Sequence, residues 1–124
     1  MNYTDLGLPI PVLSTPVSNQ NGTTSALTIG TETFLGNDIT TAGAYLRYLN
    51  VSNLALGDTL EVRVYTEVLS GDTPAIVMLR TLQNAVIEPI VFTPIYPIVN
   101  EIKFSLNQTA GTGRAFKWNI VQVA

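Results

Sequence analysis

The sequence predicts an all-β fold: an antiparallel, jelly-roll-like β-sandwich with an extended N-terminal arm. Three observations lead to this prediction. No window keeps a helical period, seven or eight apolar segments of strand length are separated by turn residues, and the longer segments alternate between apolar and polar side chains. The number and length of these segments fit the two four-stranded sheets of a jelly roll.

Residues 1–23 are predicted to form the arm, and residues 24–124 a single sandwich domain. Pro9, Pro11 and Pro16 interrupt an apolar run, which argues against a helix and against a central strand. Apolar side chains on such an arm must lie on this domain or on a neighbouring protein. They are the first candidate partner-binding residues: Tyr3, Leu6, Leu8, Ile10 and Val12.

Two strand regions follow a polar link at residues 18–24. Residues 26–35 form the first region and residues 44–51 the second. If Leu46 and Tyr48 of the second strand face the core, Tyr45 lies on the outer face of the strand, where a tyrosine can stack on a sugar or anchor a protein interface.

Residues 60–69 are the clearest strand, because apolar residues from Leu60 onward alternate with polar ones. Tyr65 lies on the polar face and is a further candidate contact. A turn then leads to a strand at residues 75–82. In the loop before the long strand, two leucines are expected to plug the end of the sandwich: Leu54 and Leu56.

The apolar stretch at residues 86–99 contains three prolines, Pro89, Pro94 and Pro97. Proline has no amide hydrogen to donate to a neighbouring strand. The stretch is therefore predicted to be an edge strand broken by a corner.

The end of the chain, residues 102–123, is predicted to be a hairpin of two alternating strands with a long loop. Phe116 and Trp118 are assigned to the core because they keep the apolar phase of the second strand. The loop Ala110-Gly111-Thr112-Gly113-Arg114 lacks the spacing and the following helix of a phosphate-binding loop. Its glycines are expected to serve turn geometry, and Arg114 at its tip is a candidate partner contact.

Composition excludes several kinds of chemistry. The chain has no His and no Cys, so Ser-His-Asp and Cys-His nucleophiles are impossible and zinc loses its preferred ligands. Glu61 and Glu67 share a strand face but are roughly 20 Å apart, too far for a glycosidase pair. Glu61 opposite Glu101 would be repulsive, so we expect basic partners instead: Arg47, Arg63 or Lys103. No enzymatic activity, cofactor or metal is expected.

Charge and hydropathy bear on the partners. The net charge is −3 and only six residues are Lys or Arg, so nucleic acid is not an expected partner. No segment predicts a membrane span or a signal peptide, so we expect a protein made in the cytoplasm. Charged residues are only 12% of the chain, about half the usual share. A surface with so few charges predicts that part of it is covered in an assembly.

Two segments resemble a known family. They are Phe104-Ser-Leu-Asn-Gln-Thr-Ala-Gly-Thr-Gly-Arg-Ala-Phe-Lys-Trp118 and Asn53-Leu-Ala-Leu-Gly-Asp-Thr-Leu-Glu-Val-Arg-Val-Tyr65. Within residues 25–124 this pattern is similar to that of head decoration, or cement, proteins of tailed bacteriophages. The resemblance implies a small β-sandwich that sits on the assembled capsid where major capsid subunits meet, often as a trimer, and does no chemistry.

The leading hypothesis is therefore a capsid cement protein on the virion surface, with the major capsid protein and neighbouring copies of itself as partners. Two alternatives remain open. One is a carbohydrate-binding β-sandwich module, which would need Tyr45 and Tyr65 on one open surface. The other is a different non-enzymatic virion component, such as a tail or fibre protein. Fold analogy alone does not separate them.

Overall fold

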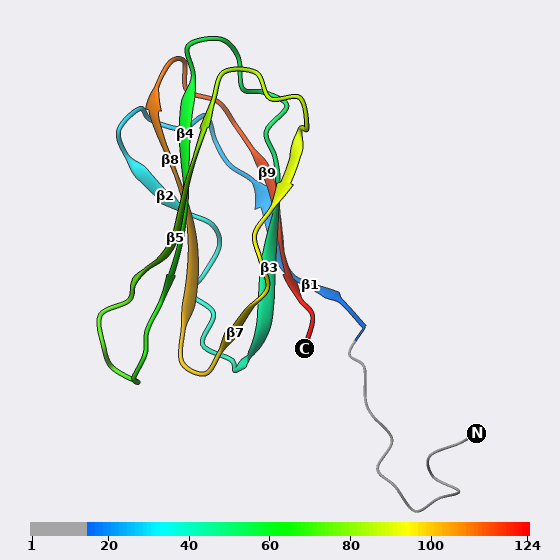
Figure 1. Ribbon diagram of the computed structural model, residues 1–124, viewed down its shortest axis with the longest axis vertical. Helices are drawn as coiled ribbons and strands as arrows, with labels where there is room; N and C mark the ends of the chain where they lie inside the picture. Colours follow the sequence, from blue (N-terminus) through cyan, green and yellow to red (C-terminus); the bar gives the residue numbers. More distant parts are fainter. Residues whose placement is uncertain (1–14) are drawn as a thin grey trace, which may run out of the picture.

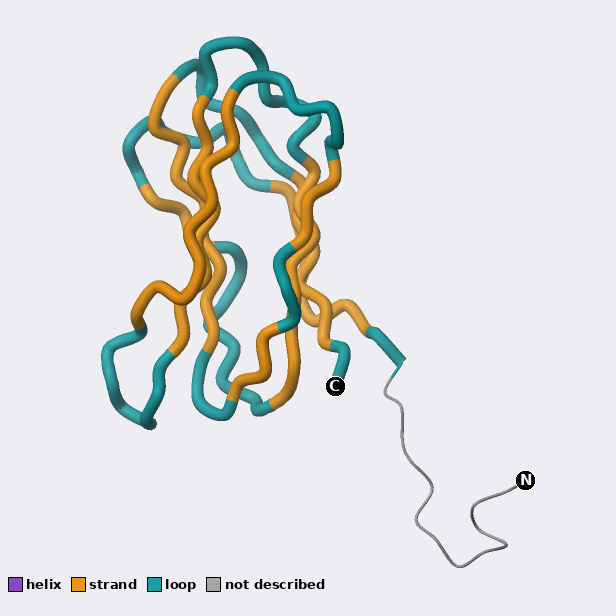
Figure 2. The backbone as a smooth tube through the Cα atoms, viewed as in Figure 1, coloured by secondary structure: helices purple, strands orange, loops and turns teal. Residues whose placement is uncertain are grey.

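A computed structural model describes residues 15–124 and confirms the all-β prediction. Two antiparallel sheets pack face to face, and the described residues form no helix that is long and apolar enough to cross a membrane (Figures 1 and 2). The strands in chain order are β1 (Val17–Thr23), β2 (Glu32–Phe34), β3 (Gly43–Asn50), β4 (Thr59–Thr66), β5 (Ala75–Gln83), β6 (Ile90–Phe92), β7 (Tyr96–Ile98), β8 (Ile102–Ala110) and β9 (Lys117–Gln122).

Sheet A has the order β1-β9-β3-β6, with β7 also paired to β3, and sheet B has the order β2-β8-β4-β5. Strands β6 and β7 pair with opposite ends of β3, so they act as one edge strand interrupted near Pro94. This confirms the predicted broken edge strand. With β6 and β7 counted together, each sheet has four strands and the strand order is that of a jelly roll.

The core lies between the inner faces of the two sheets. Alternating side chains of β4 and β8 point inward from sheet B, as predicted for the apolar phase that begins at Leu60. Phe116 and Ile120 meet them from sheet A. Trp118 packs against this core but remains partly exposed, so its assignment to the core is only partly correct.

The predicted hairpin at the end of the chain is wrong. Strand β8 pairs with β2 and β4 in sheet B, whereas β9 pairs with β1 and β3 in sheet A. The connection between them therefore crosses from one sheet to the other (Figure 1). Two strands that face one core from opposite sheets show the same alternation as a hairpin, because alternation reports the buried face and not the neighbouring strand.

Buried polar groups and two glycines hold this crossing. The fully buried Gln108 side chain donates to the carbonyls of Ala110 (3.2 Å) and Thr112 (2.6 Å) and accepts from the Arg114 amide (3.0 Å). Gly111 has a positive φ of 92°, and a Cβ on Gly113 would collide with the Leu27 carbonyl. The predicted turn role is therefore confirmed for Gly111, whereas Gly113 allows the close approach of the Leu27 carbonyl.

Three strand boundaries differ from those expected. Residues 17–23, placed in the arm and link, form β1 and pair with β9. Within residues 26–35, only Glu32–Phe34 are a strand, because the Leu27 amide bonds instead to the Arg114 carbonyl in the crossing (3.0 Å). Strand β4 ends at Thr66, and a turn follows.

The two loop leucines provide a test of the core. Leu54 is 3% exposed and closes the end of the sandwich as predicted, whereas Leu56 is 89% exposed and plugs nothing. We expect Leu54→Ala to lower the free energy of unfolding by about 2–5 kcal/mol, because it leaves a cavity. The matched control Leu56→Ala should stay within about 0.5 kcal/mol of the wild type. Equal losses in urea unfolding would contradict this packing.

Candidate functional site

The predicted partner-binding residues fall into two groups. Tyr3, Leu6, Leu8, Ile10 and Val12 lie outside the described residues, so their contacts remain predictions. The other three, Tyr45, Tyr65 and Arg114, occupy three different environments.

Tyr45 does not face outward, so this prediction is wrong. Its side chain is fully buried in the core, and its hydroxyl donates to the Thr41 carbonyl (2.8 Å). Burial raises the pKa of the Tyr45 hydroxyl. The odd-numbered side chains of β3 point inward. The sequence did not indicate this face, because both faces of the strand are largely apolar and its one charged residue, Arg47, lies on the inner face.

Tyr65 lies on the outer face of sheet B, half-buried in a polar network. Its hydroxyl donates to the Glu32 carboxylate (2.7 Å), which also accepts from Ser105 (2.9 Å) and from Arg63 (2.9 Å). Burial opposes ionisation of Glu32, but these hydrogen bonds together hold its pKa below the ordinary value. The tyrosine ring is therefore part of a structural network between β2, β4 and β8.

The carboxylates of sheet B are paired with basic groups. Glu61 pairs with Arg63, and Glu101 with Lys103 (3.5 Å), which are two of the three expected cations. Arg47, the third, pairs with neither, because its side chain is buried on the inner face of sheet A. Glu61 lies opposite Asn107 and not opposite Glu101. Within residues 15–124, no group of three or more Asp or Glu side chains is placed to hold a metal ion.

Arg114 is partly buried and paired with a buried carboxylate, so it is not a free loop tip. Its Nε donates to the buried carboxylate of Asp58 (2.9 Å), which also accepts from the amides of Ala55 (2.9 Å) and Thr112 (3.1 Å). The Ala55 amide holds the pKa of Asp58 below its ordinary value, helped against burial by Arg114 and Thr112. This cluster joins the loop before β4 to the β8–β9 crossing.

The sequence did not indicate the most distinctive surface. Strand β5 is paired only with β4 among the described strands, so its other edge is free. A bulge at Val77 interrupts its pairing, after which residues 78–83 are regular. Arg80 is the one charged residue in this strand. A long edge with so little charge favours pairing with a strand of another protein.

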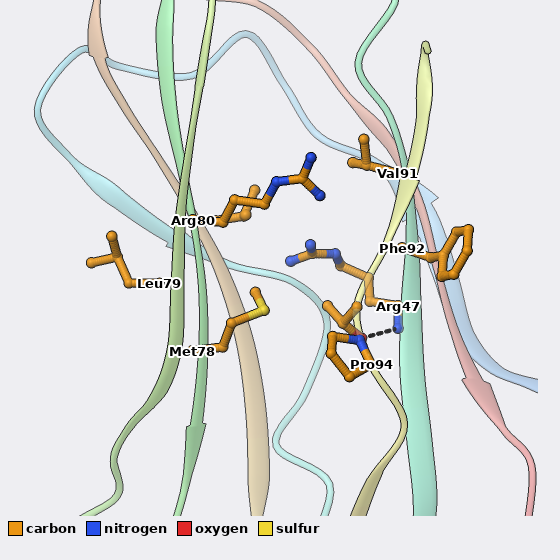
Figure 3. A pocket seen from close by; sticks show the side chains of 9 residues that line it. Arg47, Met78, Leu79, Arg80, Val91, Phe92 and Pro94 are labelled. Carbon is orange, nitrogen blue, oxygen red and sulfur yellow. Dashed lines mark hydrogen bonds between the residues drawn. The ribbon is translucent and has the colours of Figure 1, made fainter.

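Exposed apolar side chains surround this edge. We call the surface formed by β5, β6 and their connections the open edge, and define it by Ile76, Val77, Leu79, Ile87, Ile90, Phe92 and Ile95, all exposed. Leu79 and Phe92 point away from the space between the sheets (Figure 3). The prolines indicated that residues 86–99 form an edge. The edge position of β5 follows only from its long-range pairing.

The exposed aromatic pair is not the predicted one. Tyr48 and Phe92 lie on the outer face of sheet A with ring centroids 5.7 Å apart and ring planes inclined by 49°. Tyr45 and Tyr65 belong to different sheets, and Tyr45 is buried. The exposed aromatic surface therefore lies on sheet A, where such rings can anchor a protein contact.

Asp58 should make stability depend on pH. Its folded-state pKa is lowered, so its contribution is complete above the unfolded-state pKa of about 3.9 and is lost as pH falls through the folded value. We expect Asp58→Asn to cost about 1–3 kcal/mol at neutral pH, because three donors lose a charged acceptor.

The difference between Asp58→Asn and the wild type should shrink in urea unfolding at acid pH, as the pH falls below about 3.9 and through the lowered folded-state pKa of the wild-type carboxyl group. Glu88→Gln, the same change at an exposed position, is the control and should have little effect at either pH. A difference that does not change with pH would contradict the assignment of the cluster.

The chain matches no protein-family model, no curated protein and no solved structure. The likeness to phage decoration proteins therefore stays a prediction. The features that bear on function are those of the molecule itself, above all the open edge.

Proposed function

We propose that the chain is a decoration, or cement, protein of a tailed-bacteriophage head. It binds the assembled shell from outside and stabilises contacts between major capsid subunits, without catalysing a reaction. The open edge is the observation that supports this proposal, because it combines a free strand edge with exposed apolar side chains.

Strand addition is the mode of binding that the open edge favours. The free side of β5 presents main-chain donors and acceptors to an extended segment of a capsid subunit, and the side chains beside it supply apolar contact. Only 12% of the chain is charged, so this contact should depend weakly on salt. A purely electrostatic attachment would weaken strongly at high ionic strength.

Some of the other predicted contacts belong to this proposal and some do not. The arm residues, including Tyr3 and Leu6, are further proposed contacts with the major capsid protein, while neighbouring copies of the chain, as in a trimer, are proposed partners. Tyr45 is buried and Arg114 is paired with Asp58, so neither is proposed as a contact. The carbohydrate-binding alternative needs Tyr45 and Tyr65 on one open surface, but Tyr45 is buried and Tyr65 belongs to the other sheet, so it is not proposed.

The test is sedimentation of the full chain with phage heads that lack it. We expect the protein to cosediment at a fixed ratio to the major capsid protein and to raise the temperature at which the heads break open. Leu79→Lys, which places a charge on the open edge, should weaken binding about tenfold or more.

Thr109→Lys adds the same charge at an exposed position of β8, two strands from β5, and should bind like the wild type. Normal binding by Leu79→Lys would move the interface away from the open edge. Failure of the wild-type protein to cosediment with any head preparation would overturn the capsid function itself.

A further inference from the structure

A pocket opens between the two sheets on the side where β5 faces β6. Its volume is about 560 Å³, within the range of about 300–1,000 Å³ that is common for small-molecule sites. Met78 of β5, Val91 of β6 and Pro94 supply its apolar walls. Figure 3 shows the side chains of Arg47 and Arg80 extending into the same space from opposite sheets.

Arg47 is the feature of this pocket that packing does not explain. Arg47 is only 1% exposed, and its Nε and one terminal nitrogen have no hydrogen-bond partner within the described residues. The guanidinium carbon lies 5.9 Å from the centre of the Phe104 ring, a contact that leaves the N–H donors unused. A buried cation with unused donors is costly, so its occurrence at a pocket points to a ligand that completes it.

The positive charge of the pocket has no partner among residues 15–124. The ion pairs of the described residues involve Arg63, Lys103 and Arg114 as cations, and neither pocket arginine takes part. Burial lowers the pKa of Arg47 to about 10, which leaves the group charged at neutral pH. Two cations beside apolar walls concentrate positive potential in the pocket and favour an anion there.

We propose that this pocket binds a small organic carboxylate, with the carboxylate group on the Arg47 guanidinium and an apolar body along Met78, Val91 and Pro94. A planar guanidinium fork matches the two oxygens of a carboxylate. One deeply buried cation balances one negative charge, with the exposed Arg80 adding long-range attraction. The proposal is independent of the proposed capsid function.

A doubly charged phosphate fits the pocket less well. Besides the two arginines, the side-chain polar group that lines it is the Thr93 hydroxyl, whose oxygen already accepts from the Arg47 amide (3.0 Å). Arg80, the second cation, is exposed to solvent, which screens its attraction for a second negative charge. The mainly apolar walls favour a ligand that is mostly hydrocarbon.

The test is calorimetric titration of the full chain at pH 7 with octanoate, and with octanol as the neutral probe of the same length. We expect saturable binding of one octanoate per chain and at least about tenfold weaker binding of octanol. Arg47→Met should lower octanoate affinity about tenfold or more, whereas Lys117→Met, which removes an exposed charge outside the pocket, should not.

A nuclear magnetic resonance titration of the wild type keeps the test decisive if Arg47→Met does not fold. The Arg47 Nε–H resonance should shift with octanoate and stay in place with octanol. Equal binding of the two probes, unchanged affinity in a folded Arg47→Met variant, or no shift of the Arg47 resonance would each overturn the proposal.

Absence of saturable octanoate binding to the wild type would overturn the site.

Discussion

The crossing from β8 to β9 is the constraint on which the rest of this sandwich depends. Strand β8 lies inside sheet B and strand β9 inside sheet A, so the crossing fixes how the two sheets are placed over the core. Buried polar side chains hold it: Gln108 satisfies the backbone of the loop, and Asp58 ties the loop to the chain before β4. Hydrogen bonds are strong in the low-dielectric interior, and a buried polar group without a partner costs free energy. The loop path that satisfies all of these groups is therefore favoured over others.

The same physical rule distinguishes two buried charges in the interior. At the crossing, the buried charge of Asp58 is met by the Arg114 guanidinium and by two amides. Between β5 and β6, the buried charge of Arg47 has no such partner among the described residues, and the sheets leave a pocket beside it. One buried charge is thus part of the architecture, whereas the other lowers the stability of the molecule when nothing occupies the pocket.

The faces of β4 and β8 were predictable because their apolar residues keep a period of two. The face of β9 was predictable only in part, because Ile120 and Val121 are adjacent and both buried. The broken edge at residues 86–99 was predictable from its prolines. Strand β3 was not, because both its faces are apolar and its one charge points inward, contrary to the usual alternation. The open edge and the sheet crossing depend on which strands pair across long separations, which local periodicity does not specify. The surface that supports the proposed function therefore appeared only with the topology.

The four described edges of the two sheets are unequal. Strand β2 has three residues, β6 and β7 are interrupted at a proline, and β1 is polar and irregular in its pairing. Strand β5 is the longest of these edges, with one charged residue and regular pairing at residues 78–83 after its bulge. Continuous sheet growth from copy to copy needs two receptive edges on each molecule. A chain with one such edge accepts a single added strand and then stops, so it can join a surface without becoming the seed of a fibre.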